Sequence, residues 1–269
     1  MNAFENLIHS MQGTMETPMA YGTFHVIALL LTAAVTICLS LFFGNTSDKR
    51  FRGILLIIWI TLVLMELYKQ VSASLHIEDG IARWAYKWGN FPFQFCDTLF
   101  YLLPIAIFLK ESKLRDAAMA FLATYALFAG ALVLLYPGDV FTSNIGLNIH
   151  TMYHHGMQTV IGIYLFVYNR KRFTLNTFVY AIPLFVLLVA IAQILNVVIH
   201  AIVTDGYINL FYISPYFHRE YPLVGALGEK YHWSIITSVY TVGFTAIAFI
   251  VYAAEIGLTR LLGRKKEAQ

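Results

Sequence analysis

The chain has 269 residues, of which 59% are hydrophobic and 12% are charged, whereas an ordinary soluble domain has roughly 45–50% and about 25%. This composition excludes an ordinary soluble domain and predicts a polytopic membrane protein. The net charge of +3 is small, and most basic residues fall in short loops, so no nucleic-acid partner is expected. Two cysteines are too few for a disulfide-rich secreted framework. No Gly/Pro/Ser-rich linker divides the chain, which indicates a single membrane domain over residues 1–269.

Residues 1–20 are predicted to form an interfacial segment that stays attached, because they lack the charged region and short apolar stretch of a cleavable signal peptide. Their apolar residues recur at spacings of three and four, which is typical of a short helix lying on a membrane surface. These residues are Phe4, Leu7, Ile8, Met11 and Met15. A frayed polar terminus is the alternative interpretation.

Seven apolar runs are long enough to cross a bilayer as helices, which requires about 20 predominantly apolar residues each. The fold class is therefore predicted to be all-α, with seven transmembrane helices. In chain order the predicted helices cover approximately 21–43, 53–75, 92–109, 116–136, 150–168, 175–202 and 233–258.

The basic residues predict how these helices are oriented. The connections at 44–52, 110–115 and 169–174, together with the C-terminal tail, hold 13 of the 18 Lys and Arg residues. Because short cytoplasmic loops are rich in Lys and Arg, these connections and the C-terminus are predicted to be cytoplasmic and the N-terminus outside. The protein is accordingly expected to be multi-pass in a plasma membrane.

Polar residues within the predicted helices lie toward the outer leaflet. A charged side chain at the bilayer centre costs at least ~2.5 kcal/mol, so such residues suggest a functional site. Several helices place them at a similar depth, which predicts one polar pocket opening in the outer half of the bilayer. The residues concerned are His25, Glu66, Lys69, Gln70, Cys96, Asp97, His150, His154, His155 and Asn196.

Each of these residues also has a structural interpretation. Glu66 and Lys69 are three residues apart, so they can form an ion pair within one helix. Cys96 can be a small packing residue, and His25 can lie at a helix end near the lipid headgroups. The second cysteine, Cys38, lies near the inner end of its helix and is interpreted as a packing residue.

The histidines of the fifth predicted helix allow two kinds of chemistry. His150 and His154 share a helix face, whereas His155 points about 100° away. A metal-dependent hydrolase could use His25, His150, His154 and Asp97. The competing interpretation is a Cys–His pair, in which an imidazole takes the proton of a thiol that then forms a thioester. The sequence contains neither an HExxH motif nor a cysteine-rich cluster, so no metal and no cofactor are predicted.

Several short motifs occur in an order that points to a known family. Gly89 to Asp97 contains the spacing Pro92-x-x-x-Cys96 at the start of the third predicted helix, which resembles the YwaF-like integral membrane family, whose animal members include transmembrane protein 164. The other motifs that resemble this family are Glu66-Leu67-Tyr68-Lys69, Gly130, Tyr136-Pro137, His154-His155-Gly156, Asn209 and Pro215.

This resemblance implies a membrane acyltransferase fold with a Cys–His catalytic pair, similar also to the androgen-induced hydrolases that use threonine instead of cysteine. It implies phospholipid or lysophospholipid acyl chains as substrate, with Cys96 at the nucleophile position. The family's histidine falls on His154 or His155, and the doublet leaves the choice between them open.

We therefore expect a lipid acyltransferase or acyl hydrolase of a bacterial plasma membrane, with membrane lipids as its partners. Lys69 or Gln70 would donate hydrogen bonds to the oxyanion, and Glu66 or Asp97 would orient the histidine. A small-solute transporter or receptor is the alternative without covalent chemistry, although two matching halves with interrupted helices are not visible.

Overall fold

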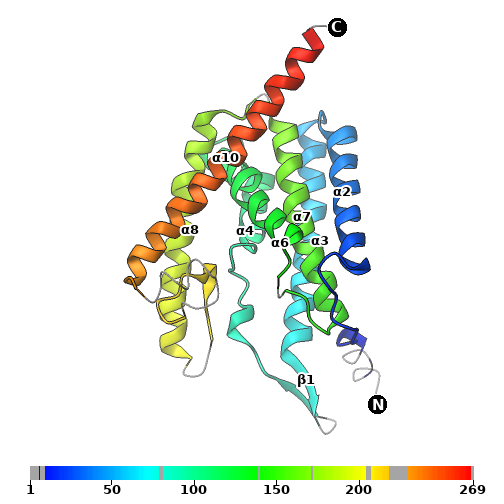
Figure 1. Ribbon diagram of the computed structural model, residues 1–269, viewed down its shortest axis with the longest axis vertical. Helices are drawn as coiled ribbons and strands as arrows, with labels where there is room; N and C mark the ends of the chain where they lie inside the picture. The colour runs from blue at the N-terminus through cyan, green and yellow to red at the C-terminus, as the bar shows by residue number, and fades with distance from the viewer. Residues whose placement is uncertain are drawn as a thin grey trace.

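The computed structural model describes residues 6, 10–78, 81–138, 140–170, 172–203, 207–217 and 230–267. It is predominantly helical, as the composition predicted, with one short β-hairpin that the all-α prediction did not include (Figure 1). The hairpin pairs β1 (Leu75–Glu78) with β2 (Ile81–Trp84) in antiparallel register. The longer helical elements are α2 (Thr23–Phe43), α3 (Asp48–Ser74), α4 (Thr98–Phe108), α5 (Lys113–Phe121), the π-helical segment η2 (Leu122–Ala126), α6 (Leu127–Leu135), α7 (Ile145–Asn169), α8 (Leu175–Ile202) and α10 (Trp233–Glu267).

The helices run side by side along the long axis of the molecule, with the hairpin at one end and the C-terminal part of α10 at the other (Figure 1). Helix α7 is central, because it packs against α2, α3 and α6. Short 3-10 helices occur in the segments at the hairpin end, η1 at Trp88–Asn90 and η3 at Leu210–Tyr212.

Among the described residues, five helical stretches are long and apolar enough to cross a membrane. They are α2, α3, the continuous stretch Lys113–Leu135 formed by α5, η2 and α6, α8, and Trp233–Thr259 of α10. The 25 residues of α7 are long enough but more polar, and α4 has only 11 residues. The chain is thus a multi-pass membrane protein, while the count of seven spans and the orientation stay predictions.

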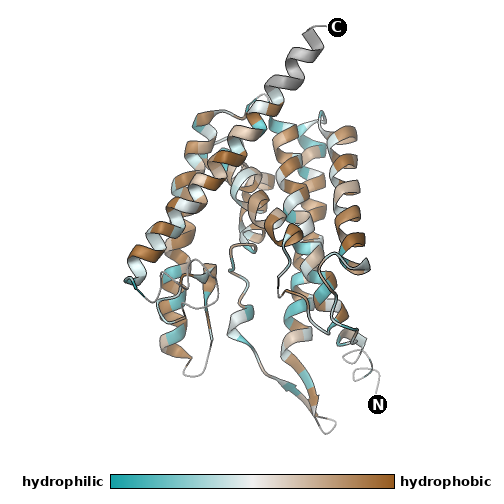
Figure 2. Cartoon of the chain, viewed as in Figure 1, coloured by the Kyte–Doolittle hydropathy of each residue, from teal (hydrophilic) through white to brown (hydrophobic). Residues whose placement is uncertain are grey.

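Hydrophobic side chains cover the outer surfaces of the helices, as Figure 2 shows along much of α2, α8 and α10. Exposed examples are Phe42 of α2 at 75% and Val242 of α10 at 70%. Large apolar patches are rare on the surfaces of soluble monomers but are expected where a protein meets lipid. The exposed surface therefore agrees with the membrane assignment.

Helix α4 begins later than predicted. The sequence suggested a helix over 92–109, which would place Cys96 four residues inside it, but the chain from Phe91 to Asp97 is irregular and the helix starts at Thr98. Pro92 lacks a backbone N–H, and the Asp97 carboxylate accepts a hydrogen bond of 2.8 Å from the backbone N–H of Gln94. Cys96 consequently lies just before a helix of about 16 Å, roughly half the thickness of the hydrocarbon core.

Irregular backbone at membrane depth is tolerated when protein surrounds it. Phe93, Phe95 and Asp97 are all at most 8% exposed, so the segment before α4 is covered by neighbouring helices. Its carbonyl and amide groups are thereby available to a site within the bundle.

Other helices begin several residues before the predicted spans, because their first turns are polar and were not counted as apolar. Helix α3 starts at Asp48 after the N-cap Ser47, and α7 starts at Ile145 after the N-cap Asn144, whose side chain accepts from the backbone N–H of Leu147. Helix α8 has the same bounds as the predicted span 175–202. Helix α10 continues beyond 258 to Glu267.

The N-terminal segment differs from the predicted interfacial helix. Phe4, Leu7 and Ile8 lie outside the described residues, and Thr14 pairs with Asn144 in an isolated β-bridge. The backbone N–H of Met15 donates to Ser143, so the helical stripe does not extend to Met15. This part of the segment packs on protein.

The basic connections meet at the end opposite the hairpin. Arg52 donates to the backbone carbonyl of Leu109 at 2.8 Å, and Arg115 donates to that of Ala106 at 3.0 Å. Both arginines also contact Asp48, at 2.6 and 3.0 Å respectively. These contacts satisfy carbonyl groups at the C-terminal end of α4 that have no partner within the helix.

Candidate functional site

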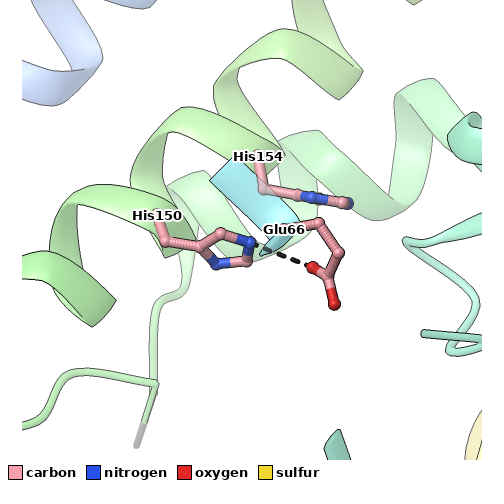
Figure 3. Close-up of side chains that lie close together, drawn as sticks. All are labelled: Glu66, His150 and His154. Carbon is pink, nitrogen blue, oxygen red and sulfur yellow. Dashed lines mark hydrogen bonds and ion pairs between the residues drawn. The ribbon is translucent and has the colours of Figure 1, made fainter. Parts of the chain in front are cut away.

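A buried polar cluster lies where α3, α7 and the irregular segment before α4 meet. Helix α7 contributes His150 and His154, which lie one turn apart and point toward Glu66 of α3 (Figure 3). The segment before α4 contributes Cys96 and Asp97. Glu66, Asp97, His150 and His154 are each at most 7% exposed, so all four side chains are buried within the fold.

Glu66 is the centre of one half of this cluster. Its Oε1 accepts from Lys69 Nζ at 2.8 Å and from Gln70 Nε2 at 2.6 Å, and its Oε2 accepts from His150 Nε2 at 3.2 Å. The ion pair between Glu66 and Lys69 is therefore present, but it belongs to a network that joins two helices.

Cys96 and His154 form the other half. One ligand atom each of Cys96, Asp97 and His154 lies within 4.8 Å of the others. The Nε2 of His154 is 3.1 Å from the backbone carbonyl of Cys96 and 3.9 Å from Asp97 Oδ1. The thiol of Cys96 points to the same Asp97 oxygen, with 3.8 Å between Sγ and Oδ1.

These contacts define the tautomer of His154. A carbonyl oxygen can only accept a hydrogen bond, so Nε2 carries the proton when it contacts the carbonyl of Cys96. The Nδ1 atom of a neutral ring is then the basic nitrogen, and it is buried without a hydrogen-bond partner among the described residues. A buried basic nitrogen with no partner is able to take a proton from a neighbouring group.

His155 lies away from the thiol. Its Nδ1 is 3.2 Å from Oε1 of Gln158 on the same helix, and its backbone carbonyl faces Gly130 of α6. The helical offset of about 100° separates the two histidines of the doublet as the sequence predicted. The structure thus brings His154, and not His155, to Cys96.

Two residues of the predicted pocket lie elsewhere. His25 accepts from the backbone N–H of Tyr21 at 2.8 Å and contacts the carbonyl of Leu134 at 2.8 Å. Asn196 of α8 makes two hydrogen bonds to the backbone of Leu210, at 3.0 and 2.7 Å. Both side chains hold segments of backbone together. The sequence indicated their depth in the membrane but not the groups that they contact.

His150 was predicted to lie in the polar pocket and to be a metal ligand of the alternative hydrolase, and the structure shows it as a direct partner of Glu66. The contact with Glu66 was not predicted, although the spacing of four residues puts His150 on the same helix face as His154. Gln70 uses both amide protons, on Glu66 and on the carbonyl of Asn90, each at 2.6 Å. It therefore has no free donor for an oxyanion.

A metal ion has potential ligands here. Suitable atoms of Glu66, His150 and His154 lie within 4.8 Å of one another. His25, which the sequence suggested as a fourth ligand, has both ring nitrogens engaged by backbone groups. The ammonium group of Lys69 is 2.8 Å from Glu66. Its positive charge would repel a metal ion bound to the same carboxylate.

The fold and the cluster define a multi-pass membrane protein with a buried site containing Cys, His and carboxylate groups. A model of the TMEM164 family matches residues 20–253. The chain belongs to this family, and the match includes every residue of the cluster. Searches of curated proteins and of solved structures found no match.

Proposed function

We propose that the protein transfers or hydrolyses acyl groups of membrane lipids, with Cys96 as nucleophile and His154 as general base. The observation that carries this proposal is the proximity of Cys96, Asp97 and His154, of which one sulfur, oxygen or ring-nitrogen atom each lies within 4.8 Å of the others. A thiol beside a basic imidazole is a suitable nucleophile for an ester carbonyl.

The reaction proceeds in two steps. His154 takes the thiol proton as Cys96 Sγ attacks the ester carbonyl, and the tetrahedral intermediate releases a lipid alcohol that receives this proton. The acyl group is then held as a thioester on Cys96. A second alcohol or water, deprotonated by His154, attacks the thioester, which yields a new ester or a fatty acid and restores the thiol.

The surrounding residues have supporting roles. Asp97 is 3.9 Å from His154 Nε2 and stabilises the imidazolium that forms when the ring takes a proton. Glu66 instead holds His150 and Lys69. Lys69 has three N–H donors, of which Glu66 uses one, so Lys69 is our candidate for stabilising the oxyanion.

The test is covalent labelling with a long-chain haloacetamide, which resembles a lipid and alkylates thiolates. In a Cys38→Ala background we expect mass spectrometry to find the label on Cys96, and Cys96→Ala to abolish it. His154→Gln should slow the labelling at least ~100-fold, whereas His155→Gln should change it little. An unreactive Cys96 in folded protein would contradict the proposal and favour a binding protein without covalent chemistry.

A metal-dependent lipid hydrolase is the second candidate, because Glu66, His150 and His154 offer three ligands within 4.8 Å of one another. The two candidates differ in their requirement for metal. The thiol mechanism predicts full turnover after chelation and no stoichiometric metal in purified protein. Stoichiometric metal, with loss of turnover on chelation and recovery on its return, would support the metal mechanism.

A further inference from the structure

A cavity of about 460 Å³ lies beside the Glu66 network, toward the hairpin end of the molecule. Its walls come from α3, the hairpin, the chain before α4 and the N-terminal part of α7. The described residues that line it include four basic side chains and none that carries a carboxylate. These four are Lys69, His76, Lys87 and His150.

Two of the four are held in place at the inner wall. Lys69 and His150 both contact the Glu66 carboxylate, at 2.8 and 3.2 Å. Glu66 therefore orients them, while its own atoms stay outside the lining of the cavity. Lys69 keeps two N–H donors beyond its bond to Glu66.

The other two basic side chains have no partner in the described part of the chain. The side chains of His76 and Lys87 make no hydrogen bond or ion pair with the described part of the chain. Lys87 is exposed, so its ammonium group is free to meet a ligand. A cavity with cations on two sides and without a carboxylate favours an anion and disfavours a metal ion.

We propose that this cavity binds a phosphate group, with Lys69 at its base and Lys87 at its rim. Lysine binds phosphate as a compact point charge, and polar side chains such as Asn90 and Thr151 complete the lining. A phosphate is carried by a lipid headgroup or occurs as the free inorganic anion, and either source presents the same chemistry to the four basic groups.

The position of the cavity connects it with the proposed reaction. Lys69 and His150 line the cavity and contact Glu66, and Glu66 lies within 4.8 Å of His154. In this respect the inference rests on the proposed function. A phosphate group bound in the cavity would belong to the lipid whose acyl group reacts with Cys96. Binding itself can be measured without any turnover.

The experiment measures the binding of two lipids with the same single acyl chain to the purified protein. One is a lysophospholipid, and the other is a monoacylglycerol, which lacks phosphate. We expect tighter binding of the lysophospholipid and a loss of about five- to tenfold in its affinity in Lys87→Gln, with no change for the monoacylglycerol. The matched control is Lys110→Gln, because Lys110 is also exposed but lies at the opposite end.

Inorganic phosphate distinguishes the two sources. Phosphate that binds alone, with an affinity lowered in Lys87→Gln, identifies the free anion as a ligand. Binding of the lysophospholipid that phosphate does not displace identifies the lipid headgroup. Equal affinity for both lipids, with no effect of phosphate or of Lys87→Gln, would overturn the proposal.

Its failure can be told apart from failure of the proposed function. If Cys96→Ala keeps the preference for the lysophospholipid and Cys96 of the wild type is unreactive, the phosphate site is supported and the proposed acyl-transfer function is contradicted. If Cys96 is reactive but the protein shows no preference for the phosphate-bearing lipid, only the proposal of a phosphate site is contradicted.

Discussion

His154 and His155 are adjacent in the sequence but have different surroundings. His154 contacts the backbone of Cys96 and keeps a buried nitrogen without a partner among the described residues, whereas His155 contacts Gln158. We expect His154→Gln to lower lipid acyl turnover by ~100-fold or more, because a general base contributes 10²–10⁴-fold. His155→Gln should retain turnover within severalfold. Equal losses in the two variants, measured on protein of equal stability, would speak against the assignment.

Glu66 connects Lys69, Gln70 and His150, so its removal affects several partners at once. Glu66→Leu alone should destabilise the protein by about 3–5 kcal/mol, because it leaves the buried ammonium group of Lys69 without its counter-charge. The double variant Glu66→Leu/Lys69→Met should recover most of this loss, since a buried ion pair is often no better than apolar residues of similar size.

The same double variant tests the role of Lys69 in the reaction. If Lys69 stabilises an oxyanion or a substrate phosphate, the folded double variant should turn over lipid at least ~100-fold more slowly than the wild type. Thermal unfolding in detergent and turnover on the same preparation separate the two effects. Near-normal turnover in a stable double variant would assign the pair a structural role.

At the scale of elements, the contact between α6 and α7 depends on glycine. A Cβ atom at Gly130 would lie 2.9 Å from Gln158 Cβ and 2.9 Å from the carbonyl of His155. These distances are shorter than van der Waals contact, so a side chain here would push α7 away. Because α7 carries His150 and His154, this contact also sets where the histidines lie relative to Cys96.

Gly130→Ala should therefore lower the unfolding temperature and the rate of Cys96 labelling together, at a cost of about 1–3 kcal/mol from overpacking. The control is Gly243→Ala in α10, where an added Cβ meets nothing within 4 Å. That change should be neutral or slightly stabilising, because alanine favours helix more than glycine does. An unchanged unfolding temperature in Gly130→Ala would show that the two helices tolerate a wider separation.

At the scale of the whole molecule, the end that carries the hairpin is predicted to face outward and the end with Arg52 and Arg115 inward. Single cysteines at exposed positions test this in a protein lacking Cys38 and Cys96. Ala82 of the hairpin and Lys110 at the opposite end are suitable because both are exposed. In intact cells an impermeant thiol reagent should label Ala82→Cys and leave Lys110→Cys unlabelled. The reverse pattern would invert the topology.

The depth of most candidate residues could be predicted from the sequence, because it follows from how far each residue lies along its apolar run. Glu66, Lys69, His150 and His154 could thus be assigned to one level. Their direction around each helix axis could not, since rotation depends on packing against neighbours. For this reason His25 and Asn196, which share that level, bind backbone groups instead of joining the cluster.

The sequence by itself determined that this is a multi-pass helical membrane protein of the TMEM164 family. Long apolar runs can cross lipid only in a form that satisfies each backbone hydrogen bond within the segment, and this leaves the helix as the solution. The tertiary structure decided that Cys96 lies in irregular chain before α4, that His154 is its neighbour, and that Lys69 faces a cavity shared with Lys87. These relations join residues far apart in the sequence, and they depend on how α3, α7 and the segment before α4 pack together.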